Sequence, residues 1–249
     1  MFQTIKDAYY VAWGDMCFMK HNFWNILVSS VMSPLLYLLA FGYGLGNGIT
    51  MEGVPYIAFI IPGIAALTSL SASFSSTATR LNVQRLYYKS FDEMLMCPLS
   101  PASIILGKSF LGLFRGLVGA TLIYILGMCV TSELYVTPML IVSVVLSCFT
   151  FSFLGVMAAL LAKSHQSMAT FSSMIILPMT FLCGTFFSAA AMPAWFQAIL
   201  YALPLTHSSS IIRAAALDWS FPWISLVVLF AFCVAFFVID VYLVKARRI

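Results

Sequence analysis

The sequence has very few charged residues. Its 249 residues include 12 Lys or Arg and 8 Asp or Glu, so that 8% are charged while 62% are hydrophobic. Soluble domains carry roughly 25% charged residues, and the mean hydropathy here is +1.02. The composition therefore excludes a soluble globular domain and predicts an integral membrane protein. The net charge of +4 needs no nucleic-acid partner, because it comes from positive residues on one side of the predicted membrane.

No stretch is both long enough and polar enough to form an ATPase domain. The triplet Gly107-Lys108-Ser109 is similar to the end of a phosphate-binding P-loop, but that motif needs a second Gly where Ala102 stands. An apolar run follows the triplet, so we expect Lys108 to snorkel from the start of a membrane helix. Any ATP-driven work would then need a partner chain.

Residues that hold metals or act as nucleophiles are sparse and scattered. The three His fall on different connecting segments, and no HExxH or GxSxG motif occurs. The six Cys form no CxxC pair, and four lie inside apolar runs, where Cys behaves as a small hydrophobic residue. We expect reduced cysteines, no metal site and no catalytic residue in this chain. An intramembrane transferase or protease is the enzyme alternative, and a channel or scaffold that uses no ATP is the other.

Six apolar runs are long enough to cross a membrane as helices. Runs of about 20 residues favour helices over the ~10-residue alternating strands of a membrane barrel. The predicted spans are 25–46, 56–78, 103–130, 138–162, 168–187 and 222–244. The sequence thus predicts an all-α membrane domain over 25–249.

Residues 1–24 predict an amphipathic helix that lies in the membrane interface. A signal peptide is not expected, because the segment has no uninterrupted apolar core. Apolar side chains recur every three or four residues, with the charged ones elsewhere on the helix. The apolar positions are Ile5, Tyr9, Ala12, Trp13 and Met16, and the charged ones are Lys6, Asp7, Asp15 and Lys20.

Positive residues gather on one side of the predicted membrane. Ten of the twelve Lys and Arg lie in the N-terminal segment, after spans two and four, or after span six. The opposite connections carry Glu52, Glu133 and Asp218 against Arg213 alone. By the positive-inside rule the basic side is cytoplasmic, and six spans place both termini there.

Hydroxyl residues are dense in the second and fifth predicted spans. Small hydroxyl residues let helices approach closely, and interrupted polar helices also line translocation routes. Pro178 and Gly184 interrupt the fifth span. The candidates for a translocation path are Ser69, Ser73, Ser76, Thr77, Ser173, Thr180 and Thr185. Helix packing is an equal alternative for each of them.

Two charges fall within predicted spans. Arg115 lies about 10 Å along the third span from Lys108, and Asp240 lies at a similar depth in the sixth. Intramembrane charges normally face the bundle interior, a wet cavity or a partner. An Arg115–Asp240 ion pair, snorkelling, and contact of Arg115 with an anionic substrate group are the alternatives.

The last outer connection, 188–221, is too apolar for a solvated loop. We expect two short helices that dip into the outer leaflet, since irregular backbone at membrane depth must be buried in protein or line a cavity. A folded external cap is the alternative. Its marked residues are Pro193, Trp195, Pro204, His207 and Arg213, with His207 expected to form a hydrogen bond within the segment.

The largest polar stretch, 80–108, contains six of the twenty charges. Its position after the second span, and the Pro-broken hairpin before the sixth, resemble the membrane subunit of type-2 ATP-binding-cassette exporters. The closest resemblance is to the daunorubicin-resistance and nodulation-factor export permeases. Two stretches carry it, namely Asp92-Glu93-Met94-Leu95 with Pro98-Leu99-Ser100-Pro101 and Gly107-Lys108, and Pro178, Gly184-Thr185-Phe186-Phe187, Met192-Pro193, Trp195 and Leu203-Pro204-Leu205-Thr206-His207 to Arg213.

The resemblance implies a permease that exports a drug-like, lipid-linked or oligosaccharide-type substrate across a bacterial cytoplasmic (inner) membrane. It implies two cytoplasmic ATPase subunits, which hold ATP and Mg, and a second permease copy in a homodimer or a heterodimer. Segment 81–102 would include the coupling helix, with Arg85 and Glu93 at its surface and the N-terminal helix beside it. The substrate route would lie at the dimer centre, mainly along spans one, two and five. The expected coupling residues are Arg85, Tyr87, Tyr88, Lys89, Asp92, Glu93, Leu95 and Pro98.

Overall fold

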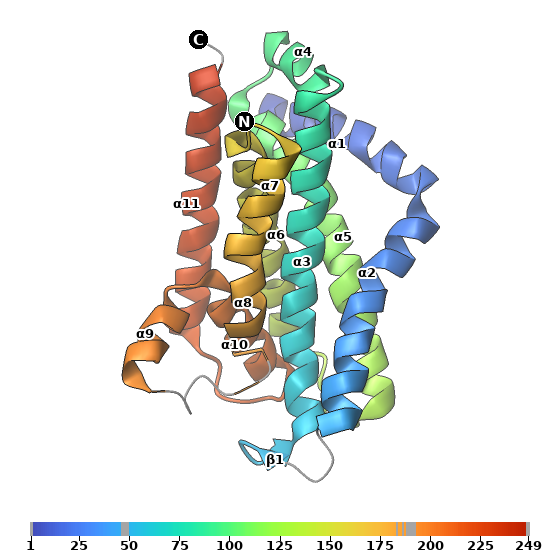
Figure 1. Ribbon diagram of the computed structural model, residues 1–249, viewed down its shortest axis with the longest axis vertical. Coiled ribbons are helices and arrows are strands. Elements are labelled where there is room, and N and C mark those ends of the chain that lie inside the picture. The colour runs from blue at the N-terminus through green and yellow to red at the C-terminus, as the bar shows by residue number, and fades with distance from the viewer. Residues whose placement is uncertain (1, 46–49, 183, 186, 188–192, 248–249) are drawn as a thin grey trace.

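The computed structural model is a bundle of long helices (Figure 1), and it describes all residues except 1, 46–49, 183, 186, 188–192 and 248–249. Parts of the predicted outer segment and of its Met192 and Phe186 motifs therefore lie outside the described residues. The helices are α1 (Phe2–His21), α2 (Phe23–Tyr37), α3 (Tyr56–Leu86), α4 (Ser90–Met96), α5 (Pro101–Val130), α6 (Pro138–Leu161), α7 (His165–Phe171), α8 (Leu177–Leu182), α9 (Ala194–Tyr201), α10 (Pro204–Ala216) and α11 (Trp223–Arg247), with π-helical turns η1 (Leu38–Leu45) and η2 (Ser172–Ile176) and a hairpin of β1 (Thr50–Met51) and β2 (Val54–Pro55).

Four helices, α3, α5, α6 and α11, are long and apolar enough to cross a membrane. They cover the second, third, fourth and sixth predicted spans. The first and fifth fall on helices of mixed type, α2 with η1 and α7 with η2 and α8. Proline lies close to both changes, since Pro34 precedes η1 by one turn and Pro178 follows η2. An all-α membrane protein is therefore what the chain forms, and the count of six spans stays a prediction.

Helix α3 lies at the centre of the bundle, packed on α5, α6 and α10. Glycines of α5 allow this approach. A Cβ built on Gly112 would overlap the hydroxyls of Thr77 and Ser152, and one on Gly116 would overlap the Ser73 hydroxyl. The GxxxG spacing of α5 thus serves close helix packing.

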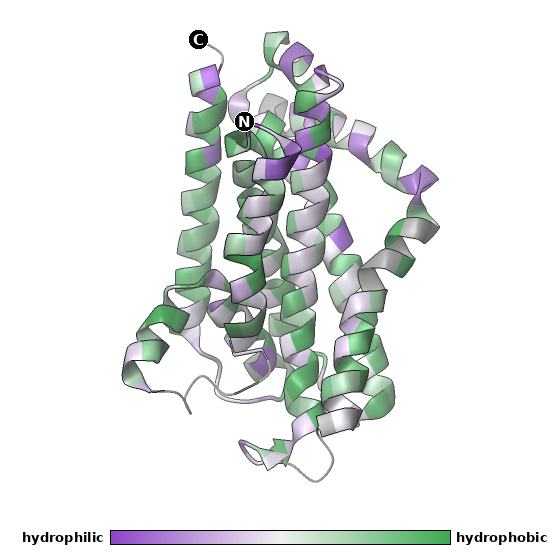
Figure 2. Ribbon diagram, in the orientation of Figure 1, coloured by the Kyte–Doolittle hydropathy of each residue, from purple (hydrophilic) through white to green (hydrophobic). Residues whose placement is uncertain are grey.

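The cytoplasmic end expected from the sequence can be recognised by its elements. Helix α4, the first residues of α1 and the last turn of α11 all lie at one end of the bundle, whereas the β-hairpin lies at the other (Figure 1). Hydrophilic residues cluster at the α4 end, while α11 is hydrophobic along most of its length (Figure 2). An even number of crossings gives this arrangement. Which side of the membrane this end faces stays a prediction.

Candidate coupling site and polar interior

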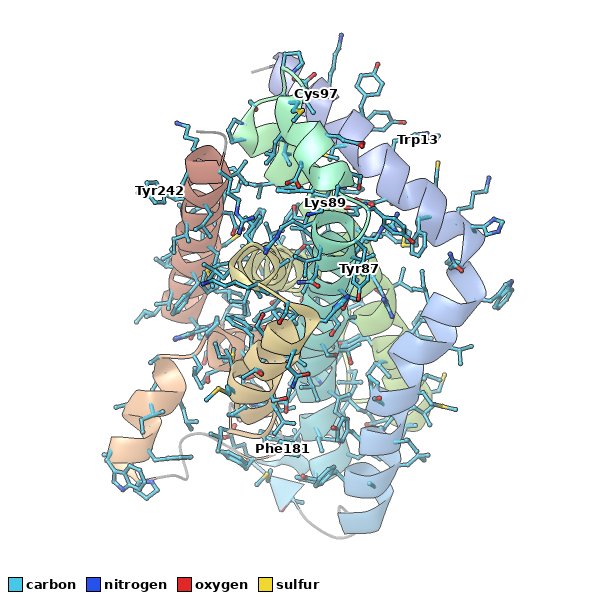
Figure 3. The ribbon with its side chains drawn as sticks, turned by 45° about the horizontal axis from the view of Figure 1, so that its top comes forward. Trp13, Tyr87, Lys89, Cys97, Phe181 and Tyr242 are labelled. Atoms are coloured by element: carbon cyan, nitrogen blue, oxygen red, sulfur yellow. The ribbon has the colours of Figure 1, made fainter. Side chains whose placement is uncertain are left out.

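Helix α4 lies at the end of the bundle and is anchored there by the buried side chain of Phe91. Phe91 is 1% exposed and packs in the cluster that contains Leu81 and Ile104. Lys89 precedes the helix in a left-handed conformation with φ of 58°, which turns the chain sharply after α3. Figure 3 shows Tyr87 and Lys89 at this turn and Cys97 at the far end of α4. The turn and the anchor fix how α4 is presented.

The outer face of α4 and its turn is exposed and amphipathic. Tyr87 and Tyr88 are each 68% exposed and Met96 is 87% exposed. The predicted coupling residues Lys89, Asp92, Glu93 and Pro98 are exposed as well, and Leu95 packs partly against the cluster around Phe91. Both carboxylates lie in the first turn of α4, where they favour the helix dipole. Six of the eight predicted coupling residues are thus exposed at α4 and the turns on either side of it, and Leu95 is partly buried.

Arg85 is the exception, and its predicted surface position is wrong. Its side chain is buried and donates hydrogen bonds to the carbonyls of Ala159, Leu160 and Ala162 at the end of α6. The last carbonyls of a helix have no partner within the helix, so a guanidinium with several donors can satisfy them together. Arg85 therefore fastens the end of α3 to the end of α6.

The Pro-Leu-Ser-Pro motif begins α5. The Ser100 hydroxyl accepts a hydrogen bond from the backbone N–H of Ser103 at 3.1 Å, and Pro101 occupies the first turn. A Ser N-cap followed by Pro is a strong start signal for a helix. The motif therefore sets where the chain leaves the α4 surface and enters the bundle.

A buried carboxylate joins three helices below α4. Oδ2 of Asp15 on α1 lies 2.8 Å from Lys108 Nζ on α5. Oδ1 accepts from Arg80 Nε at 3.1 Å and from Gln84 Nε2 at 2.9 Å, both on α3. The prediction that Lys108 snorkels is therefore wrong, and Asp15 is buried although it lies off the apolar positions of α1. Side chains 93 residues apart leave no local sequence signal of their pairing.

The hydroxyl-rich face of α3 is buried in this chain. Ser69, Ser73, Ser76 and Thr77 are at most 5% exposed. Thr77 and Ser152 of α6 share a hydrogen bond of 2.8 Å, and Ser152 donates to the Ser109 carbonyl of α5 at 2.7 Å. These contacts favour the packing alternative for Thr77, and the Gly116 contact does so for Ser73.

The predicted path residues of the fifth span lie in a different environment. Ser173 is exposed and donates to the Ala169 carbonyl at 3.0 Å, and Thr180 donates to the Leu177 carbonyl at 2.7 Å. Thr185 is fully buried. A role of these residues in translocation stays a prediction.

The segment before α11 contains the two short helices α9 and α10. Pro193 precedes α9, Pro204 begins α10, and Trp195 is 69% exposed. His207 shares a 2.9 Å hydrogen bond with the Tyr201 carbonyl, the kind of contact expected of it. Almost all of α10 is buried in the bundle. Insertion of this segment into the outer leaflet stays a prediction.

Arg213 of the predicted outer segment lies inside the bundle. It is buried, donates to the carbonyls of Phe59 at 3.2 Å and Gly184 at 2.9 Å, and stacks 3.8 Å over the Phe59 ring. Its donors satisfy backbone carbonyls at the start of α3 and after α8. Arg213 thus ties α10 to two other parts of the bundle.

The proposed ion pair between Arg115 and Asp240 is not formed. Asp240 is fully buried, and neither of its carboxylate oxygens has a hydrogen-bond partner among the described residues. Arg115 instead lines a groove between α3, α5 and the bent arm of α1 and α2.

Residues suited to metal binding stay apart in the described ranges, where no group of three His, Cys, Asp or Glu side chains comes together. The cysteines at 17, 97, 129, 148 and 233 are free thiols. Cys183 lies outside the described residues.

Comparisons with known proteins find relatives that match most of this chain. Nodulation protein J of Neorhizobium galegae is 30% identical over 209 residues, which is 80% of this chain and 77% of the relative. Nodulation protein J of Rhizobium meliloti (strain 1021) is 30% identical over 217 residues, covering 82% of this chain and 76% of the relative.

The inner membrane transport permease YadH of Escherichia coli (strain K12) is 26% identical over 236 residues, 92% of each chain. The family model described as "ABC-2 type transporter" matches residues 9–217, from the first turns of α1 to the end of α10. The sequence resemblance is thereby confirmed, and this chain belongs to the ABC-2 type transporter family of permeases.

Proposed function

We propose that this chain is the membrane subunit of an ATP-driven exporter in a bacterial cytoplasmic (inner) membrane, with both termini in the cytoplasm. A separate ATPase subunit, which binds ATP and Mg, would sit on α4 and drive the bundle. Two copies of each subunit would form the working complex, with a homodimer or a heterodimer of permeases. The cargo would be drug-like, lipid-linked or of oligosaccharide type.

The observation that carries the proposal is the exposed face of α4 on its rigid anchor. Tyr87 and Met96 offer a large apolar surface beside Asp92 and Glu93, and aromatic and Met side chains are enriched at protein interfaces. Because Phe91 is buried in the bundle, a partner that holds this face can move the bundle as a rigid body.

Contacts behind α4 support the transmission of such a movement. Arg85 binds the end of α3 to α6, and Asp15 binds α1 to α3 and α5. A displacement of α4 would therefore reach four helices through contacts between buried groups. The name of one relative, an inner membrane transport permease, supports transport as the work that this movement does.

The test uses a matched pair of double variants. Tyr87→Ala with Glu93→Ala removes an aromatic and a carboxylate from the α4 surface. Tyr135→Ala with Glu133→Ala makes the same changes between α5 and α6, at the other end of the bundle. A tagged wild-type chain from its native host is expected to co-purify with a protein that hydrolyses ATP. The α4 variant should lose that protein and the ATP-dependent export, with membrane insertion unchanged, while the control keeps both.

Two results would contradict the proposal. One is a wild-type chain that retains no ATP-hydrolysing partner and performs chemistry by itself, which would favour the intramembrane-enzyme alternative. The other is an α4 double variant that keeps its partner and exports as well as the control variant. In that case the ATPase must bind elsewhere.

A further inference from the structure

A groove of about 500 Å³ lies on the side of α3 that faces away from α6. Its walls come from α3 and α5 and from α1 and α2, which form a bent arm beside them (Figure 1). Cavities of this size hold small ligands or lipid head groups. Of the residues that contact Asp15, Arg80 lines the groove, so a ligand there would reach the Asp15 cluster through Arg80.

One face of α3 lines the groove with polar side chains. Ser75, Thr79 and Val83 lie there at the four-residue spacing that aligns side chains on one helix face, and Arg80 and the buried Ser76 lie beside them. From Ser75 to Val83 this face extends about 12 Å. Ser75 and Thr79 are exposed, in contrast to the buried hydroxyls on the opposite face of the helix. The hydroxyls can donate hydrogen bonds to an oxygen-rich ligand.

The groove is positively charged. Arg80 and Arg115 both line it, and none of the described residues that line it is acidic. Arg80 is held in place, with its Nε 3.1 Å from Asp15 and its guanidinium carbon 3.9 Å from the centre of the Phe18 ring. Its counter-charge is shared, because Asp15 also pairs with Lys108. The surroundings therefore keep an excess of positive charge for an incoming anion.

Most of the remaining wall of the groove is apolar. Phe18 of α1, Ile26 of α2 and Leu111 of α5 form this part, and Tyr88, which follows α3, also lines the groove. A free anion would gain nothing from the apolar side chains, whereas an acyl or other hydrocarbon chain would bury apolar surface against them. We propose that the groove binds an anionic amphiphile, with a phosphate or carboxylate head group between Arg80 and Arg115 and a hydrocarbon chain against the apolar wall.

Guanidinium groups suit this head group, because they bind phosphate and carboxylate oxygens with two parallel hydrogen bonds. Arg115 lies about 10 Å deeper along α5 than Lys108. A head group that enters from the cytoplasmic leaflet would therefore pass the level of Lys108 before it reaches Arg115. Which leaflet the amphiphile enters from depends on the proposed topology, but its binding to the groove does not. The inference goes beyond the proposed function, since such binding needs no ATPase.

Native mass spectrometry of the full-length chain in detergent measures the binding directly. Titration with dioleoyl phosphatidic acid is expected to give one tightly bound molecule, and titration with dioleoyl phosphatidylcholine a much weaker complex. Arg115→Gln should weaken the phosphatidic acid complex roughly tenfold, the loss of one charge-assisted hydrogen bond. Arg115→Lys should recover part of it, and Lys245→Gln, at the end of α11, should leave it unchanged.

Further arms keep the result interpretable. If Arg115→Gln does not elute as a folded species, Ser75→Ala with Thr79→Val removes exposed hydroxyls instead and should weaken binding several-fold. Equal affinity of phosphatidic acid for these variants and for wild type would overturn the site. Displacement of the lipid by an equal concentration of inorganic phosphate would overturn the role of the hydrocarbon wall.

Native mass spectrometry can also identify the natural amphiphile. Protein purified from its host membrane should retain a species whose mass identifies either a phospholipid or another anionic amphiphile, which would be the exported cargo. Loss of that species in Arg115→Gln ties it to the groove. Retention in the variant at wild-type occupancy would refute the assignment. None of these measurements requires transport, so they stand apart from the test of the ATPase partner.

Discussion

Lys108 and Asp15 form a buried ion pair, with Lys108 Nζ 2.8 Å from Oδ2 of Asp15 and both side chains at most 4% exposed. The pair joins the first helix of the chain to the start of α5. The same carboxylate accepts hydrogen bonds from Arg80 and Gln84, so it gathers three helices behind the α4 surface. The positive charge of Lys108 in α5 is thus paired with the carboxylate of Asp15 on α1, the helix that the sequence predicts at the membrane surface.

Asp15→Ala is expected to be among the most destabilising single changes. It leaves Lys108 buried without its counter-charge, and removing one partner of a buried pair costs about 3–5 kcal/mol. Asp7→Ala, on the same helix but outside this cluster, should cost less than about 0.5 kcal/mol. Melting of the purified chain in detergent compares them. Adding Lys108→Met to Asp15→Ala should recover part of the loss, and strictly additive losses would speak against the pair.

Gly112→Ala tests the close approach of α5 to α3 and α6. The new Cβ would overlap the hydroxyls of Thr77 and Ser152, which are hydrogen-bonded to each other. Overpacking of this kind costs about 1–3 kcal/mol. Gly14→Ala is the matched control, because nothing lies within 4 Å of its Cβ, and Ala is the better helix former. The melting temperature should fall for Gly112→Ala and hold or rise for Gly14→Ala; equal values would refute the packing role.

Much of the fold could be predicted because its signals are local. Uninterrupted apolar runs gave α3, α5, α6 and α11, and proline in the first turn marks the start of α5, α6 and α10. The α4 surface could be predicted for the same reason, since its polar residues are contiguous in the chain. The π-helical turns and the short hairpin at Thr50–Pro55 have no comparable signal and were not expected.

The partners of the buried charges could not be predicted. Lys108 lies at the start of an apolar run, where snorkelling is the usual inference, whereas Arg85 lies in the polar stretch 80–108 and Arg213 in the last outer connection. Their actual contacts are, respectively, the Asp15 carboxylate, carbonyls of α6, and carbonyls of α3 and the turn after α8. Each contact depends on which helices become neighbours in three dimensions. A helical wheel of one segment shows no such neighbour.

Arg115 and Asp240 should behave as independent sites. Asp240 has no hydrogen-bond partner among the described residues, and Arg115 lies on the groove side of α5. Changes at sites that share no contact add within about 0.5 kcal/mol. The losses in the free energy of unfolding caused by Arg115→Gln and by Asp240→Asn should therefore add up to the loss in the double variant. A double variant more stable than this sum would indicate an ion pair between Arg115 and Asp240, with coupling like that expected between Asp15 and Lys108.

The proposed topology can be tested with two thiols at opposite ends of α5. Cys97 lies just before this helix and Cys129 in its last turn, and both are exposed. If α4 faces the cytoplasm, a membrane-impermeant maleimide should label a variant whose only cysteine is Cys129 in intact spheroplasts. The variant with only Cys97 should react after the membrane is permeabilised and not before. Labelling of Cys97 from outside intact spheroplasts would place α4 on the wrong side for an ATPase, and the coupling role of its exposed face would fall with that result.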